Sequence, residues 1–157
     1  MNEMLANQYF ISERFKEASY QYDEVLKLHP ENHLAKKKLV LCQIKLGEIA
    51  RALKLFDELI KSNIDTIFKN EICICTQICK DMIFEFESFN SNLDPKERYL
   101  ILGMLWTYCD FKIAKRFFQK LYKMLPNDEN LLTTIRTINH FIIKKKELDD
   151  GKETLFA

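Results

Sequence analysis

One alanine between two large apolar residues recurs along this chain. The first copy reads F-x-x-A-x-x-x-Y around Ala18, and the second reads I-x-x-A-x-x-x-F around Ala52. These two alanines are roughly 34 residues apart, a period typical of repeat proteins built from helical units. A third copy, F-x-x-A-x-x-x-F around Ala114, follows after a longer interval. Such a repeat indicates a stack of similar supersecondary units that share one continuous core.

The residue types inside each copy predict a pair of packed helices. Residues three before and four after an alanine lie on the same face of a helix. The alanine itself is small enough to let a second helix approach closely. Pro30 and Pro126 each follow their alanine by twelve residues. Because proline cannot continue a helix, each would end the second helix of its hairpin.

This pattern resembles the tetratricopeptide repeat family. The first unit contains LANQYF, in which Leu5, Ala6 and Tyr9 match the family's first helix. The second contains KLGEIARALKLF, with Gly47 between the two helices. The third departs from the family, because Leu102 occupies the place of the small residue in its first helix. The resemblance implies an all-α fold, a superhelix of antiparallel helical hairpins with a closing C-terminal helix.

We predict a single domain over residues 1–148. Its repeats would span 1–32, 33–66 and 95–128, with an irregular helical unit at 67–94 between the second and third repeats. A closing helix at 129–146 would cover the last apolar face, which an open-ended stack needs. The charged segment 147–157 is expected to break at Gly151 and fray.

The irregular unit lacks the alanine pattern but has helical periodicity. One apolar stripe is predicted to run along it, widened by neighbouring residues: Ile67, Cys75, Ile78, Met82, Phe86 and Phe89, with Phe68, Ile72, Cys79 and Ile83. Asp94 is expected to cap the next helix, with Pro95 at its first position. Either one long helix or a shortened hairpin fits this segment.

Composition narrows the class of protein. Lys plus Arg number 24 against 23 Asp plus Glu, so the net charge is +1 and does not favour a nucleic-acid partner. No stretch approaches the roughly 20 apolar residues of a membrane span, and the N-terminus does not resemble a secretory signal. Five cysteines, an odd number, favour a reducing compartment. We therefore expect a cytoplasmic protein.

The sequence contains little that indicates catalysis or metal binding. Cys73, Cys75 and Cys79 lack the paired turns of a structural zinc site, and a buried cysteine often acts as a small apolar residue. His29 and His33 lie on either side of Pro30. No glycine-rich phosphate loop or hydrolase motif is present. We predict no metal, no cofactor and no enzymatic activity.

The resemblance implies that a partner binds in the concave groove lined by the first helix of each repeat. Mapped onto this chain, the groove residues would be Asn7, Phe10, Ile11, Lys37, Leu41, Ile44, Lys45, Tyr99, Gly103 and Trp106. Each could instead belong to the core. The basic clamp that some family members use for acidic C-termini is not expected here, because Glu3 and Lys38 replace its Lys and its second Asn.

The prediction for function is a non-enzymatic protein–protein interaction module, adaptor or chaperone-like, that binds a peptide or helix with apolar anchors. Two alternatives stay open. The protein could be a structural subunit of a larger complex, or a bacterial secretion chaperone, which it resembles in size and architecture. Sequence does not give the oligomeric state.

Overall fold

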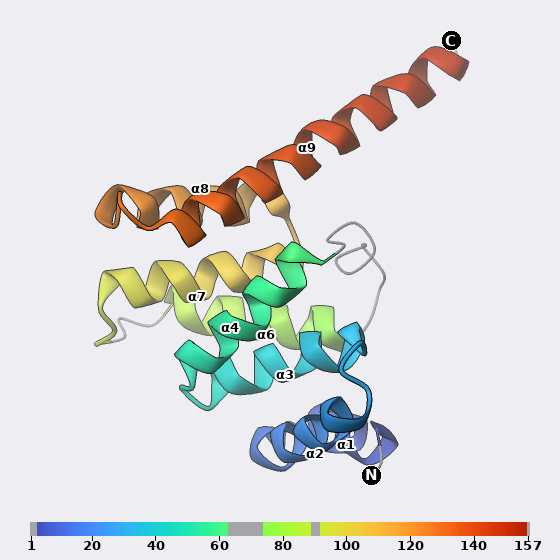
Figure 1. The fold of residues 1–157 in the computed structure, drawn as a ribbon, viewed down its shortest axis with the longest axis vertical. Coiled ribbons are helices and arrows are strands. Elements are labelled where there is room, and N and C mark those ends of the chain that lie inside the picture. The colour runs from blue at the N-terminus through green and yellow to red at the C-terminus, as the bar shows by residue number, and fades with distance from the viewer. Residues whose placement is uncertain (1–2, 63–73, 89–91, 157) are drawn as a thin grey trace. The chain divides into compact units, whose positions relative to one another are not determined.

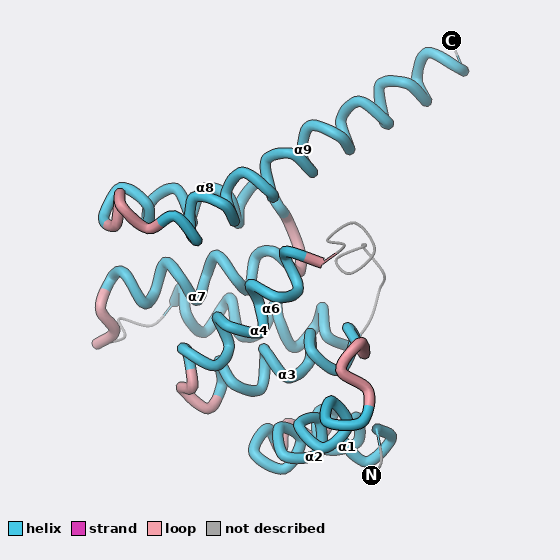
Figure 2. The backbone as a smooth tube through the Cα atoms, in the orientation of Figure 1, coloured by secondary structure: helices cyan, strands magenta, loops and turns pink. Residues whose placement is uncertain are grey.

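The computed structural model describes residues 3–62, 74–88 and 92–156. These residues form helices joined by short loops and contain no strand (Figures 1 and 2). The helices are α1 (Glu3–Ile11), α2 (Phe15–Leu28), α3 (His33–Lys45), α4 (Ile49–Lys61), α6 (Ile74–Ser88), α7 (Pro95–Thr107), α8 (Phe111–Met124) and α9 (Glu129–Phe156). The predicted all-α fold of helical hairpins is confirmed.

The chain divides into two compact units, residues 1–91 and 92–157, where we predicted a single domain over 1–148. In the first unit, α1 packs on α2 and α3 packs on α4, with α2 against α3 and α6 also beside α3. In the second unit, α7 packs on α8, and α9 covers α8. The irregular segment therefore belongs with the first two repeats, and the third repeat belongs with the closing helix.

The three alanines lie where the hairpin interpretation puts them. Ala18, Ala52 and Ala114 are fully buried. The aromatic residue four positions after each alanine is also buried: Tyr22, Phe56 and Phe118. A helix that carries alanine and an aromatic residue on one face can bring its backbone close to its neighbour and still fill the space beside it.

Asparagine or aspartate side chains begin several of the helices. Asp94 accepts a hydrogen bond from the backbone N–H of Lys96 at 3.2 Å, which confirms the predicted cap before Pro95. Asn32 and Asp128, each two residues after a proline, accept bonds at 3.0 Å from backbone N–H groups at the start of α3 and α9. The proline therefore ends one helix and the residue two positions later begins the next.

The two N-terminal hairpins turn through the same backbone motif. Glu13 and Gly47 both have positive φ, 59° and 78°. In each turn, the next backbone N–H bonds five residues back, from Arg14 to Tyr9 and from Glu48 to Gln43. This is the hydrogen-bond pattern of a Schellman motif, whose left-handed position favours glycine.

The predicted end of the C-terminal helix was wrong. We expected the closing helix to end at residue 146 and the chain to fray from 147, with a break at Gly151. Helix α9 instead continues from Glu129 to Phe156 and extends beyond α8 (Figure 1). One glycine costs a helix only about 1 kcal/mol, and it does not end this one.

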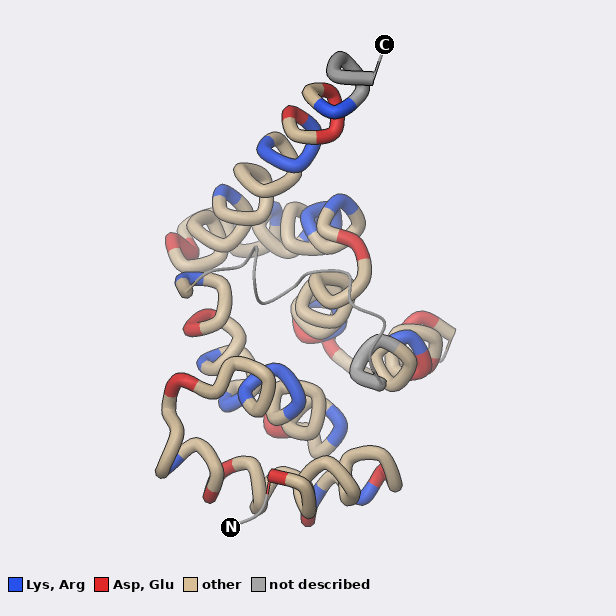
Figure 3. The backbone as a smooth tube through the Cα atoms, turned by 90° about the vertical axis from the view of Figure 1, so that its right-hand side faces the viewer, with Lys and Arg blue, Asp and Glu red and all other residues tan. Residues whose placement is uncertain are grey.

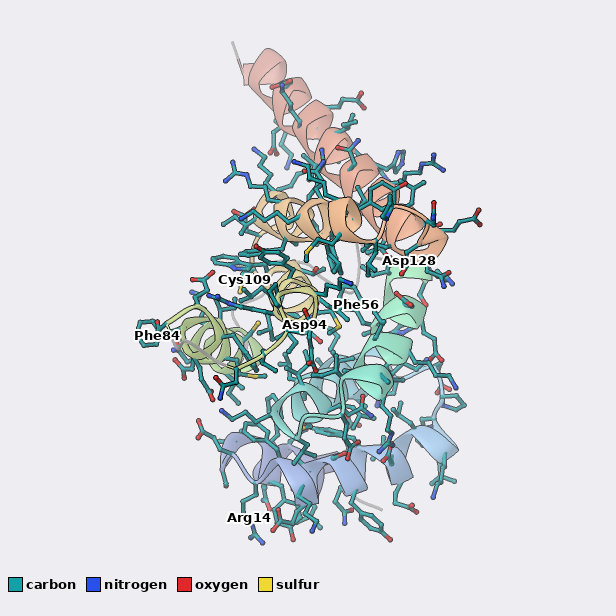
Figure 4. The ribbon with its side chains drawn as sticks, turned by 90° about the vertical axis from the view of Figure 1, so that its left-hand side faces the viewer. Arg14, Phe56, Phe84, Asp94, Cys109 and Asp128 are labelled. Carbon is teal, nitrogen blue, oxygen red and sulfur yellow. The ribbon has the colours of Figure 1, made fainter. Side chains whose placement is uncertain are left out.

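The irregular unit is helical over Ile74–Ser88. Of its predicted stripe, Ile78, Cys79, Met82 and Ile83 are buried and Phe86 is half-buried. Residues 67–73 and 89 of the predicted stripe lie outside the described residues. Phe84 projects away from α6 with 70% of its surface exposed (Figure 4). Helix α6 therefore has one apolar face and one open face.

Candidate functional site

The predicted groove residues of α1 divide between core and surface. Phe10 is buried, with ring centroids 6.1 Å from Phe15 and 6.3 Å from Tyr22. The prediction that Phe10 lines a groove was wrong, because its ring fills the contact between α1 and α2. Ile11, one residue later, leaves 53% of its surface exposed.

The side chain of Asn7 connects α1 to two other helices. Its Oδ1 accepts a hydrogen bond from the Tyr22 hydroxyl of α2 at 2.7 Å and another from Lys38 Nζ of α3 at 2.9 Å. Both donors come from parts of the chain that follow α1. Asn7 therefore fixes α1 against α2 and α3, and Lys38, which was not among the predicted site residues, is part of this network.

The predicted groove face of α3 is largely covered. Leu41 and Ile44 are buried, so the prediction that they line an open groove was wrong. Lys45 lies one turn after Leu41 on the same face, and its ammonium forms an ion pair with Glu85 of α6. Helix α6 thus lies along the side of α3 that would hold a partner. Lys37 is half-buried.

The predicted site residues of the second unit have three different environments. Gly103 is buried, and a Cβ there would lie 2.7 Å from Phe118 Cε1. Gly103 therefore lets α7 approach α8, and the prediction that it lines an open groove was wrong. Tyr99 is half-buried, with its ring 6.3 Å from Phe117 of α8. Trp106 is half-buried, and its role in a groove stays a prediction.

An exposed apolar surface lies on α1, on the face that carries Asn7. Met4 and Ile11 expose 66% and 53% of their surfaces and lie seven residues apart, on the same face of α1. Asn7 lies between them on that face. We call the surface of Met4, Asn7 and Ile11 the α1 face.

Charged side chains elsewhere in the first unit connect its helices. Arg51 of α4 forms ion pairs with Asp23 of α2 at 3.2 Å and with Glu48 at 2.7 Å. The negative charge of Asp23 raises the pKa of Arg51, and the hydrogen bond to Glu48 raises it further. Lys36 of α3 lies 3.5 Å from Glu58 of α4. The pairs of Arg51 with Asp23 and of Lys36 with Glu58 connect neighbouring helices, so we regard them as structural.

The described residues contain no cluster of His, Cys, Asp or Glu side chains that could hold a metal ion. Cys42 and Cys79 are buried, and Cys109 is half-buried. Cys73 of the cysteine group considered from sequence lies outside the described residues. Within the same part of the chain, no helix is both long and apolar enough to cross a membrane.

Comparison with known families finds a match over part of the chain. Residues 9–66 match the tetratricopeptide repeat model, a range that runs from the end of α1 through α4. No curated protein and no solved structure shows significant similarity to the chain. The matched range contains the first two copies of the alanine pattern, around Ala18 and Ala52, and the structure folds it as antiparallel hairpins. Residues 9–66 of this helical-hairpin protein are therefore similar to tetratricopeptide repeats in both sequence and fold.

Proposed function

We propose that this protein is a non-enzymatic binding module, an adaptor or chaperone-like protein, that holds an apolar segment of a partner protein on the α1 face. Tetratricopeptide repeats generally mediate protein–protein interaction. The observation that carries the proposal here is the exposure of Met4 and Ile11 on one side of a helix that Asn7 fixes in place.

The physical basis is apolar burial at a preorganised surface. Two apolar side chains one heptad apart can contact a helical or extended segment that presents its own apolar anchors at matching spacing. Because Asn7 already ties α1 to two other helices, α1 does not have to become ordered on binding. Preorganisation of this kind lowers the entropic cost of association.

The proposed site is narrower than the groove predicted from sequence. The ion pair between Lys45 and Glu85 places α6 along the second hairpin's share of that groove. The partner segment would therefore contact the first hairpin.

A site-specific photo-crosslinker tests the proposal. Benzoylphenylalanine replaces Ile11 in one protein and Tyr20, which is 63% exposed on α2, in a matched control. We expect a discrete cross-linked protein from the cell of origin with the first and not with the second. Equal cross-linking at both positions, or none at either, would contradict the proposed site.

Binding of the purified cross-linked partner then provides the quantitative measurement. Ile11→Glu should weaken binding by at least about tenfold, since a charge at an apolar contact loses an anchor and is desolvated. Tyr20→Glu should leave the affinity unchanged. Both residues are exposed, so circular dichroism should show the same helicity for both variants.

The cytoplasm is our proposed location. The odd number of cysteines, five in all, supports it, because an oxidising compartment favours paired cysteines. Fractionation of the cells of origin, with detection by an antibody to this chain, tests the proposal.

A further inference from the structure

Helix α8 carries a row of positive charge along its exposed side. Its sequence contains five basic residues and no acidic residue between Phe111 and Met124. Four of them follow one another at spacings of four, four and three residues, and all four are exposed: Lys112, Arg116, Lys120 and Lys123. We call these four residues the cationic stripe. Figure 3 shows blue segments along α8.

The core and the cationic stripe lie on opposite sides of α8. Ala114, Phe118 and Leu121 are buried against the rest of the second unit. Residues at spacings of three and four share a face, so the stripe stays on one side of the helix over its whole length. The packing of α8 therefore holds the four charges in line.

The ion pairs found among the described residues do not neutralise the stripe. All seven of them use other cations. Lys115, the fifth basic residue of α8, donates to Asn139 Oδ1 of α9 at 2.6 Å and has a structural role. Lys120 lies over two aromatic rings, with its Nζ 5.7 Å from the Tyr99 centroid and 5.2 Å from the Phe117 centroid. These rings orient the ammonium group while it keeps its charge.

We propose that the cationic stripe binds an acidic α-helix of a partner protein. With a rise of 1.5 Å per residue, the stripe is about 16 Å long, and its charges are separated by about 6, 6 and 4.5 Å along the axis. Carboxylates at every third or fourth position of another helix repeat at the same intervals. Charge complementarity of this kind favours one partner register and accelerates association.

Two other anionic partners, a membrane surface and a nucleic acid, fit the stripe less well. A helix that lies on a membrane needs exposed apolar side chains beside its cations. Outside the stripe, the exposed residues of α8 are Gln119 and Met124, so this helix offers a single exposed apolar side chain. A nucleic-acid-binding domain usually carries a strong overall excess of basic residues, whereas this chain has a net charge of only +1.

The stripe is a second surface, separate from the α1 face. It belongs to α8 in residues 92–157, and the α1 face belongs to the unit of residues 1–91. Each of the two proposals can therefore be contradicted without contradicting the other. Ile11→Glu changes the α1 face alone, and substitutions in the stripe change α8 alone.

A displayed library of helical peptides tests the proposal on the full chain. Each peptide is long enough to span the stripe, with its positions on one face randomised among Asp, Glu, Lys, Gln, Ala and Leu. We expect selection to enrich peptides with Asp or Glu at successive spacings of three and four. Lys112→Glu/Arg116→Glu should reduce their binding by at least about tenfold, as should raising the salt concentration well above the physiological range.

The matched control is Lys16→Glu/Lys54→Glu, which makes the same change of charge at two exposed lysines of α2 and α4. It should bind the selected peptides like the natural protein. Equal loss in both double variants would mean that net charge alone attracts the peptides, and would overturn the proposal. Enriched peptides without acidic residues would also overturn it.

Two further measurements separate the other anionic partners. The full chain is mixed with vesicles rich in phosphatidylserine and, separately, with a short DNA duplex of mixed sequence. We expect neither to bind with an affinity that depends on Lys112 and Arg116. Tighter stripe-dependent binding to the vesicles or to the duplex than to the selected peptides would overturn the assignment to a protein helix.

Discussion

Gly103 shows how the size of one side chain decides the contact between α7 and α8. A Cβ at this position would lie within 3 Å of three atoms of the Phe118 ring, which is itself fully buried. The family pattern places a small residue one position earlier, where this chain has a buried Leu102. The small residue of the third hairpin is therefore present, but shifted by one position.

We predict that Gly103→Ala destabilises the protein by about 1 kcal/mol. Overpacking a core costs about 1 to 3 kcal/mol, and the better helix propensity of alanine returns up to about 1 kcal/mol. Chemical denaturation measures the change. Gly151→Ala in α9 is the control, because no atom lies within 4 Å of the added methyl group, and it should not lower the stability. If the two variants lose equal stability, Gly103 is not a packing contact.

Glu13 and Gly47 allow a second prediction at single residues, because they occupy the same turn in successive hairpins. A residue other than glycine with positive φ costs roughly 1 kcal/mol. Gly47→Ala should therefore lower the free energy of unfolding by about that amount, since no neighbouring atom lies within 4 Å and only the backbone changes. Glu13→Gly should have a smaller effect or raise stability. An equal loss from both substitutions would contradict this interpretation of the turns.

At the scale of elements, α9 combines a packed half with an exposed half. Leu131, Ile135 and Ile138 are buried, whereas every described side chain from residue 143 to residue 152 is exposed. The packed half lies against α8, and Lys115 bonds to it through Asn139. The helix is therefore held by its first half.

We predict that Ile138→Ala and Leu148→Ala have different effects although both truncate an apolar residue of the same helix. The first leaves a cavity in the core and should cost about 2 to 5 kcal/mol. The second removes a side chain that is 59% exposed and should change stability by less than about 0.5 kcal/mol. Equilibrium denaturation of the two variants measures both. A large loss from Leu148→Ala would mean that the exposed half is covered in solution.

At the scale of the whole molecule, a substitution can disrupt the packing of either unit separately. Ala52 and Ala114 are equivalent alanines, both fully buried, in the first and second units respectively. Glutamate at either position would bury an unpaired charge, which costs several kcal/mol, and would force its hairpin apart. The only tryptophan, Trp106, belongs to the second unit.

We predict that Ala114→Glu unfolds the C-terminal unit and that Ala52→Glu unfolds the N-terminal one. Both variants should lose helicity by circular dichroism. Only Ala114→Glu should shift Trp106 emission to longer wavelength, because exposure to water does so for an indole ring. A shift of equal size in both variants would show that the units unfold together. An Ala114→Glu protein that melts like the natural one would contradict the hairpin contact itself.

Local sequence determined the helices and their hairpin contacts. The alanines, their aromatic neighbours and the two prolines have consequences within one or two turns of the chain, so spacing alone located them. The same holds for the cap formed by Asp94 beside Pro95. These features depend on residues close in sequence, and they agree with the repeat match over residues 9–66.

Only the tertiary structure decided which apolar residues face outward and which helix covers which face. Phe10, Leu41 and Ile44 have the spacing of groove residues, yet all three are buried, and Lys45 pairs with Glu85 forty positions later. Gly103 is likewise a packing residue only because Phe118 of another helix lies against it. A helical period shows that two residues share a face. What lies against that face depends on contacts between distant segments, and the sequence pattern does not contain them.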